Sequence, residues 1–150
     1  GTILSDATKN NWYLCVSPAC DCVPEQNNTN LTKRLAPGFK PLKFLELTEI
    51  TQGSALKNAT DGKYLFLPDD VILQVEGEPK LDYVIVHNKA AEPLNFNVSF
   101  LECDESELTT TPQKLTVYAQ LKEEYAARFQ ALASHHVGRI GVDFINYVAP

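Results

Sequence analysis

The chain has 150 residues, of which 44% are hydrophobic and 21% are charged. These fractions are typical of a globular domain and exclude a disordered or fibrous chain. Thirteen basic residues against 19 acidic ones give a net charge of −6, which opposes attraction to a phosphate backbone. We therefore expect one folded domain over residues 1–150 that does not bind nucleic acid.

The location of the protein is predicted from what the sequence lacks. It has no apolar run of the roughly 20 residues that a membrane-spanning helix needs, and residues 1–30 lack the order of a secretory signal. We expect a cytoplasmic protein that is not bound to a membrane. The chain begins at Gly1 and contains no Met, which indicates a domain excised from a longer protein.

The first expected strand covers residues 11–23, which begin as an apolar run typical of a buried strand. Pro18 removes a ladder donor, so we expect the strand to bulge or end there. A polar segment rich in Asn, Thr and Pro follows over residues 24–41, and we interpret it as a long excursion from the core.

Short segments rich in β-branched and aromatic residues follow, separated by breaks that contain Gly or Pro. The clearest strand covers residues 94–101, where apolar side chains at positions 94, 96, 98 and 100 alternate with polar ones at 95, 97 and 99. The strand expected next follows an acidic, Thr-rich turn. The expected strands are 42–50, 63–67, 71–76, 81–88, 94–101 and 114–119.

The apolar period then changes to three and four residues, which is typical of an amphipathic helix. We expect this helix to end at Gly138 in a left-handed conformation, and a last strand to cover residues 142–148. The fold class predicted is α+β and mainly β: a small antiparallel barrel or sandwich with one long amphipathic C-terminal helix. The positions that recur at these steps are Leu121, Tyr125, Phe129, Leu132 and His136.

The residues from Ser17 to Cys22 form the most unusual stretch. In an extended chain Cys20 and Cys22 point to the same face and Asp21 to the other. A disulfide between the two is disfavoured because their Cα atoms would lie roughly 6.6 Å apart, near the upper limit for a bridge. Two thiols on one face suit zinc, so Cys20 and Cys22 are the candidate metal ligands, with buried inert cysteines as the simpler interpretation.

A second group of candidates lies near the expected end of the helix. His135 and His136 are candidate ligands or bases, although polar side chains are also favoured there by the unpaired carbonyls and the helix dipole. Arg139 is a candidate anion-binding residue or a solvated residue in a turn. The carboxylate of Asp21 next to Cys20 disfavours ionisation of the Cys20 thiol unless the fold places a cationic side chain close to it. We expect Asp21 to pair with Arg139.

Four cysteines and four glycosylation sequons permit a third interpretation, a secreted glycoprotein with two disulfides. It predicts that every sequon asparagine is exposed. These asparagines are Asn27, Asn30, Asn58 and Asn97.

Two stretches together carry a resemblance: the Ser-x-x-Cys-Asp pattern of Ser17, Cys20 and Asp21, and the segment from Ala119 to Gly141. They resemble a poorly characterised bacterial domain found C-terminal in receiver-like proteins encoded near ATPases of stress or phage-defence systems. A basic residue often follows the pattern in that family, whereas Pro24 and Glu25 stand here. The resemblance implies a signalling or partner-binding role and no particular activity.

No phosphate-binding loop, nucleophile elbow or paired-His metalloprotease motif occurs in the sequence. We therefore expect a protein-interaction or sensing module of a larger bacterial signalling protein, without a cofactor, whose partner is another protein or another domain of the same chain. The binding candidates are Ser17, Cys20, Asp21, His135, His136 and Arg139. The alternatives are a zinc-binding or cysteine-dependent enzyme domain centred on Cys20, Asp21 and Cys22, and the secreted glycoprotein.

Overall fold

The computed structural model describes residues 1–17, 41–51, 62–75, 80–86, 95–104 and 107–145. This part of the chain consists of eight strands and one helix, α4. The elements are β1 Thr2–Ser5, β2 Trp12–Cys15, β3 Pro41–Glu49, β4 Tyr64–Phe66, β5 Ile72–Gln74, β6 Leu81–Val86, β7 Asn95–Asp104, β8 Glu107–Gln120 and α4 Glu123–Ile145.

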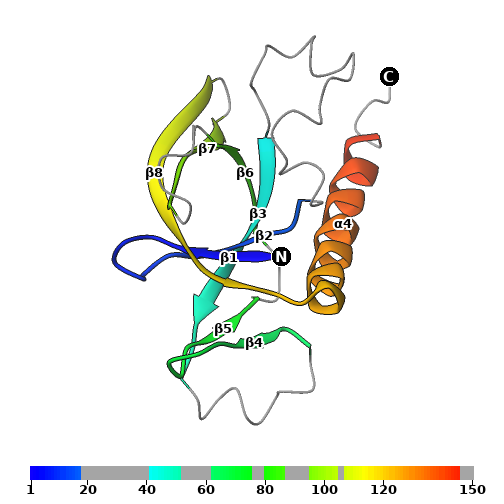
Figure 1. The fold of residues 1–150 in the computed structure, drawn as a ribbon. Helices are drawn as coiled ribbons and strands as arrows, with labels where there is room; N and C mark the ends of the chain where they lie inside the picture. Colours follow the sequence, from blue (N-terminus) through cyan, green and yellow to red (C-terminus); the bar gives the residue numbers. More distant parts are fainter. Residues whose placement is uncertain (18–40, 52–61, 76–79, 87–94, 105–106, 146–150) are drawn as a thin grey trace.

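Six of the strands close into an antiparallel barrel. Around the ring the order is β1, β2, β3, β6, β7 and β8, and β8 pairs back to β1 (Figure 1). The β4–β5 hairpin lies outside the ring and pairs with the end of β3 at Thr48 and Glu49. Closure removes the free edges of the ring, and it confirms the predicted class of a mainly β domain with an antiparallel barrel and one C-terminal helix.

The barrel interior is filled by side chains that alternate along each strand. On β7 Phe96, Val98 and Phe100 point inward, as the period-2 pattern predicts. Buried residues from all six ring strands complete this first core: Leu4, Cys15, Leu42, Phe44, Val84, Val98, Phe100 and Leu115.

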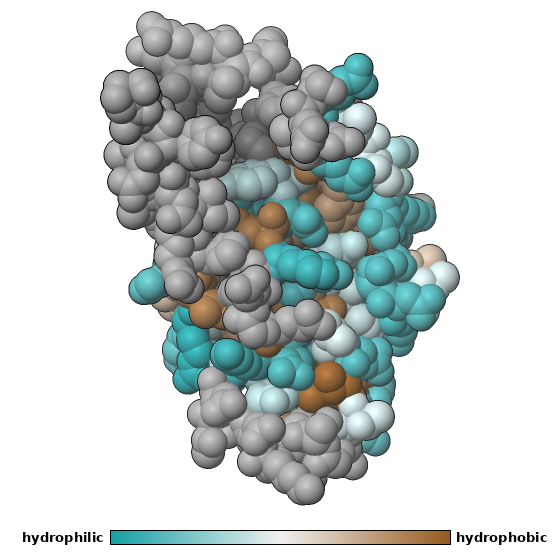
Figure 2. Space-filling view, turned by 180° about the vertical axis from the view of Figure 1, so that it is seen from behind, coloured by the Kyte–Doolittle hydropathy of each residue, from teal (hydrophilic) through white to brown (hydrophobic). Residues whose placement is uncertain are grey.

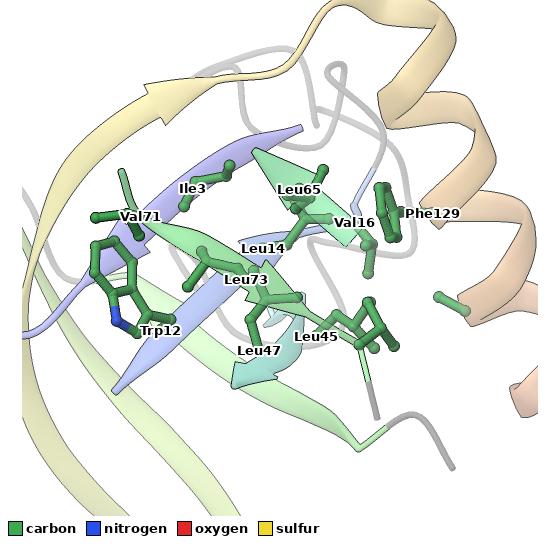
Figure 3. Packing of buried hydrophobic residues seen from close by; sticks show 12 residues of the cluster. Ile3, Trp12, Leu14, Val16, Leu45, Leu47, Leu65, Val71, Leu73 and Phe129 are labelled. Carbon is green, nitrogen blue, oxygen red and sulfur yellow. The ribbon is translucent and has the colours of Figure 1, made fainter. Parts of the chain in front are cut away.

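A second core lies on the outer face of the barrel, between the ring, the β4–β5 hairpin and α4. Phe129 is 1% exposed and points from α4 into this cluster next to Val16 (Figure 3). Because successive side chains of a strand point to opposite faces, β2 and β3 supply both cores. The buried residues here are Ile3, Trp12, Leu14, Val16, Leu45, Leu47, Leu65, Val71, Leu73, Val75, Phe129 and Ala133.

The start of α4 is held against the first residue of the chain. The backbone N–H of Leu121 donates to the carbonyl of Gly1 at 2.8 Å, and the Gly1 nitrogen donates to the carbonyl of Cys15 at 2.9 Å. A Cβ at Gly1 would lie 2.6 Å from the Cβ of Ala126, so the helix packs directly on the backbone there. These contacts join β1, β2 and α4 at one corner.

Two expectations for the C-terminal region are wrong. The helix does not end at Gly138 but continues to Ile145, so residues 142–145 are helical and not part of a strand. A glycine inside a helix costs only about 1 kcal/mol, which is too little to end a helix by itself. The ring is instead completed by β1, a four-residue strand that no sequence pattern indicated.

The β7–β8 hairpin is also longer than expected, because the Thr-rich segment predicted as a turn is strand. Thr109 to Thr111 pair with β7, since β-branched residues suit a pleated surface. Pro112 has no backbone N–H to donate to a neighbouring strand. It is tolerated within β8 because β1 pairs only with residues 116–120, so position 112 needs no hydrogen bond to β1.

Candidate functional site

Ser17 is the one binding candidate of the first strand region that lies among the described residues. It is 4% exposed, and its hydroxyl oxygen accepts a hydrogen bond from the backbone N–H of Lys43 at 2.7 Å. Its carbonyl lies 3.4 Å from Nε2 of Gln130 on α4. Ser17 thus joins the end of β2 to β3 and to the helix.

The remaining candidates are not brought into a described site. Cys20, Asp21 and Cys22, and with them the expected pairing of Asp21 with Arg139, lie outside the described residues. His135 is exposed on α4, and for His136 and Arg139 only the helical backbone is described. Within the described part of the chain no three His, Cys, Asp or Glu side chains lie close enough to hold a metal ion.

One of the four sequon asparagines that the glycoprotein hypothesis expects to be exposed lies among the described residues. Asn97 is exposed on the outward face of β7, as that hypothesis expects, whereas Asn27, Asn30 and Asn58 lie outside the described residues. No described helix is long and apolar enough to cross a membrane.

The structure shows a different cluster, at one end of the barrel, where the inward-facing rows of four strands carry polar side chains. Tyr13 on β2 lies directly opposite Glu46 on β3, and Asp82 on β6 lies opposite Phe44 in the same wall. Glu102 continues the inward row of β7 two positions beyond Phe100. We call Tyr13, Glu46, Asp82 and Glu102 the acidic rim.

An aromatic floor supports the acidic rim from inside the barrel. The ring centroids of Tyr13 and Phe100 are 4.9 Å apart, and Phe44 lies 6.3 Å from each of them. Such tilted and edge-on contacts are favourable between aromatic rings and hold the Tyr13 ring in place. Tyr13 therefore belongs both to the acidic rim and to the aromatic cluster inside the barrel.

Two members of the acidic rim, Asp82 and Tyr13, have a raised pKa. Burial, followed by the charges of Glu46 and Glu102, raises the pKa of Asp82, which Lys80 lowers in part. Burial and the charges of Asp82 and Glu46 raise the pKa of Tyr13 to about 12. Each shift means that the folded protein disfavours the ionised form of the group, because like charges lie close together in a half-buried place.

Few described groups offset this negative charge. Lys80 Nζ lies 3.5 Å from an oxygen of Glu46, but both side chains are well exposed and such a pair contributes little. The hydroxyl of Thr111 donates to Glu102 at 3.3 Å. Asp6, in the β1–β2 turn, adds a further negative charge near Tyr13. Although burial raises its pKa, hydrogen bonds from Asn11 and Thr8 lower it overall and keep its carboxylate ionised.

We expect Asp82→Asn to stabilise the protein at neutral pH. The folded-state pKa of Asp82 is raised above 3.8, so deprotonation costs folding free energy that appears as the pH rises through and above that value. An amide removes this cost, and the gain should be about 0.5 kcal/mol, the upper range for surface substitutions. Urea unfolding at several pH values measures it, and a gain that is equally large at pH 3 would contradict the electrostatic cause.

Ionisation of Tyr13 should make the stability of the protein depend on pH in the alkaline range as well. Because its pKa is about 12 in the folded protein against 10.0 ordinarily, stability should be lost as the pH rises from 10 towards 12. Tyr13→Phe should lose less stability over that range than the wild-type protein, in urea unfolding at pH 8 and pH 11. If both proteins lose the same amount, the phenol of Tyr13 ionises as readily when folded as when unfolded.

Sequence reasoning did not select any residue of the acidic rim. A signal was present, because Asp82 and Glu102 continue the apolar period-2 rows of their strands as the next inward position. A carboxylate in an inward row marks the point where that row leaves the core. That four such positions meet at one end depends on the register between strands, which no single strand pattern contains.

The fold and the rim define a class: a closed six-stranded antiparallel barrel with a covering helix and an acidic end. Comparison with protein-family models, curated proteins and solved structures finds no match to this chain.

Proposed function

We propose that this domain is a protein-interaction module whose acidic rim binds a cationic segment of its partner. The observation that carries the proposal is the convergence of three carboxylates and a phenol at one barrel end, where they raise the pKa of Asp82 and Tyr13. Groups held together at a cost in stability are typical of sites kept for binding or chemistry.

The chemistry of the acidic rim favours Lys and Arg side chains. A cation between Glu46, Asp82 and Glu102 would relieve the mutual repulsion that the free domain carries. Tyr13 adds a half-buried aromatic ring to the rim, and aromatic rings attract guanidinium and ammonium groups. The net charge of −6 adds a long-range attraction for the same partner.

The partner in this proposal is another protein or another domain of the same chain, within a larger bacterial signalling protein. The resemblance of Ser17, Cys20 and Asp21 to a domain of receiver-like proteins supports that setting. The absence of any specific catalytic motif from the sequence supports a binding role over an enzymatic one.

The test is binding of a fluorescently labelled oligo-arginine peptide, measured by anisotropy at low and high salt. The wild-type protein should bind it, and binding should weaken as salt screens the charges. The triple variant Glu46→Gln, Asp82→Asn, Glu102→Gln should bind at least about threefold more weakly, since each exposed ion pair contributes about 0.2–1 kcal/mol.

A matched control separates the acidic rim from net charge. The exposed Asp70 can be changed to Asn and the exposed Glu123 and Glu124 to Gln, which alters the net charge by the same amount at the β4–β5 turn and the start of α4, outside the ring. This control should keep most of the affinity. Equal losses in the two triple variants would show that the peptide senses net charge alone, and the proposed site would then be wrong.

A zinc-binding domain is the second candidate. It required the end of the helix to lie near the first strand, and Ser17 contacts Gln130, five positions before His135 on α4. Native mass spectrometry after loading with zinc should show one bound ion, which is lost in Cys20→Ser and Cys22→Ser and kept in Cys15→Ser. Wild-type protein that binds no zinc would remove this candidate.

A further inference from the structure

The β4–β5 hairpin leaves one edge of β4 without a strand partner among the described residues. In the sheet order β4 is terminal, after β3 and β5. The hairpin lies below the barrel in the view of Figure 1. On the opposite face of the molecule hydrophobic residues surface as separate patches between hydrophilic ones, and one patch lies at the height of this hairpin (Figure 2).

The hydrogen-bond phase of the hairpin decides which groups point to the open edge. The N–H of Val75 donates to the carbonyl of Lys63 at 3.0 Å, and the N–H of Leu67 donates to Val71 at 2.9 Å. Bonded and non-bonded pairs alternate along an antiparallel ladder. The N–H and C=O groups of Tyr64 and Phe66, which lie between, therefore point away from β5 to the open edge.

The side chains of β4 divide between the core and the solvent. Leu65 is buried in the outer core, while Phe66 on the other face is 53% exposed, the most exposed large hydrophobic side chain of the described chain. Tyr64 lies on the same face as Phe66 because the two are separated by two positions. An exposed aromatic beside an unpaired edge is the kind of feature that natural sheets normally cover or charge.

We propose that the occupant of this edge is β4 of a second copy of the chain, paired antiparallel about a two-fold axis at Leu65. In that register Tyr64 of one copy lies opposite Phe66 of the other, on both sides of the axis. The four outward backbone groups of each copy then meet their complements, and two cross-strand aromatic pairs form on the solvent face. The pairing is isologous, as in most closed dimers.

The charges at the two ends of β4 match this arrangement. Lys63 precedes the strand, and the turn after it carries Asp69 and Asp70. A two-fold antiparallel pairing places the Lys63 end of each copy beside the turn of the other, so opposite charges face each other. A parallel pairing would instead bring like charges together. The shared edge is short, so we expect a weak, concentration-dependent dimer.

Sedimentation equilibrium over protein concentrations up to about 1 mM tests the proposal. The wild-type protein should approach the dimer mass as concentration rises, and Phe66→Glu should raise the dissociation constant at least about tenfold. The matched control Tyr125→Glu changes an exposed aromatic on α4 and should leave the equilibrium unchanged. A wild-type protein that stays monomeric, or equal losses in both variants, would overturn the proposal.

A cysteine experiment tests the register itself. Tyr64→Cys and Phe66→Cys, mixed and oxidised, should form a mixed disulfide, because the two positions are opposite and about 5.5 Å apart between Cα atoms. Each variant alone should give only the wild-type background, since identical positions lie too far apart across the axis. Cross-linking of Tyr64→Cys to itself would overturn the proposed register. Both tests are independent of peptide binding at the acidic rim.

Discussion

Replacing Phe129 by Ala is expected to lower the free energy of unfolding by about 3–5 kcal/mol, the range for truncating a fully buried aromatic side chain. Phe129 is 1% exposed and is the largest buried side chain in the part of α4 whose side chains are described. Its loss leaves a cavity next to Val16 and weakens the packing of the helix against the barrel. Urea unfolding followed by circular dichroism measures the change.

Tyr125 is the control for Phe129. It lies one turn earlier on α4, is 46% exposed and contacts Arg128 rather than the core. Tyr125→Ala should change stability by no more than about 0.5 kcal/mol. If Phe129→Ala were equally mild, the helix would contribute little to the fold, and the packing of the outer core would have to be reconsidered.

Trp12→Ala should cost a similar amount, about 3–5 kcal/mol. The indole is 1% exposed, its ring meets that of Tyr118 edge-on at 5.0 Å, and Nε1 donates to Glu49 at 3.1 Å. The hydroxyl of Tyr118 in turn lies within hydrogen-bond distance of the Pro68 carbonyl and of Asp69. Trp12 therefore holds the β4–β5 hairpin against the ring as well as filling the core.

Trp12→Phe separates these contributions. It keeps an aromatic ring against Tyr118 but loses the hydrogen bond to Glu49, so its cost should be clearly smaller than that of Trp12→Ala. Both variants lack the only tryptophan of the chain, so tryptophan fluorescence cannot follow their unfolding. Thermal unfolding is therefore measured by circular dichroism. Equal losses in the two variants would mean that the hydrogen bond, and not the buried ring, holds the hairpin.

Much of the fold could be predicted from local patterns. The alternation in residues 94–101 predicted the inward row of β7, and the three- and four-residue period predicted α4 with Phe129 on its buried face. Both patterns work because the position of a side chain on a strand or helix follows from backbone geometry alone. Patterns of this kind say nothing of β1, whose four residues show no period of their own.

The candidate site was much harder to predict. The sequence analysis selected cysteines, histidines and Arg139 as candidates, because the metal-binding, catalytic or anion-binding chemistry of these residue types can be recognised from each residue alone. The acidic rim consists of ordinary carboxylates, and each alone is typical of a solvated strand end. Their significance comes from the repulsion between Glu46, Asp82 and Glu102, which three different strands bring together.

The sequence by itself determined the mainly β composition, the sites of most strands and the amphipathic helix, since these depend on contacts within about one turn or strand. Only the tertiary structure decided that β1 closes the ring, that α4 runs through Gly138 and that the acidic rim exists. Each of these depends on register and packing between segments far apart in the chain. The energies of strand pairing and packing between distant segments outweigh the local conformational preference of a short strand such as β1 or of a glycine within a helix.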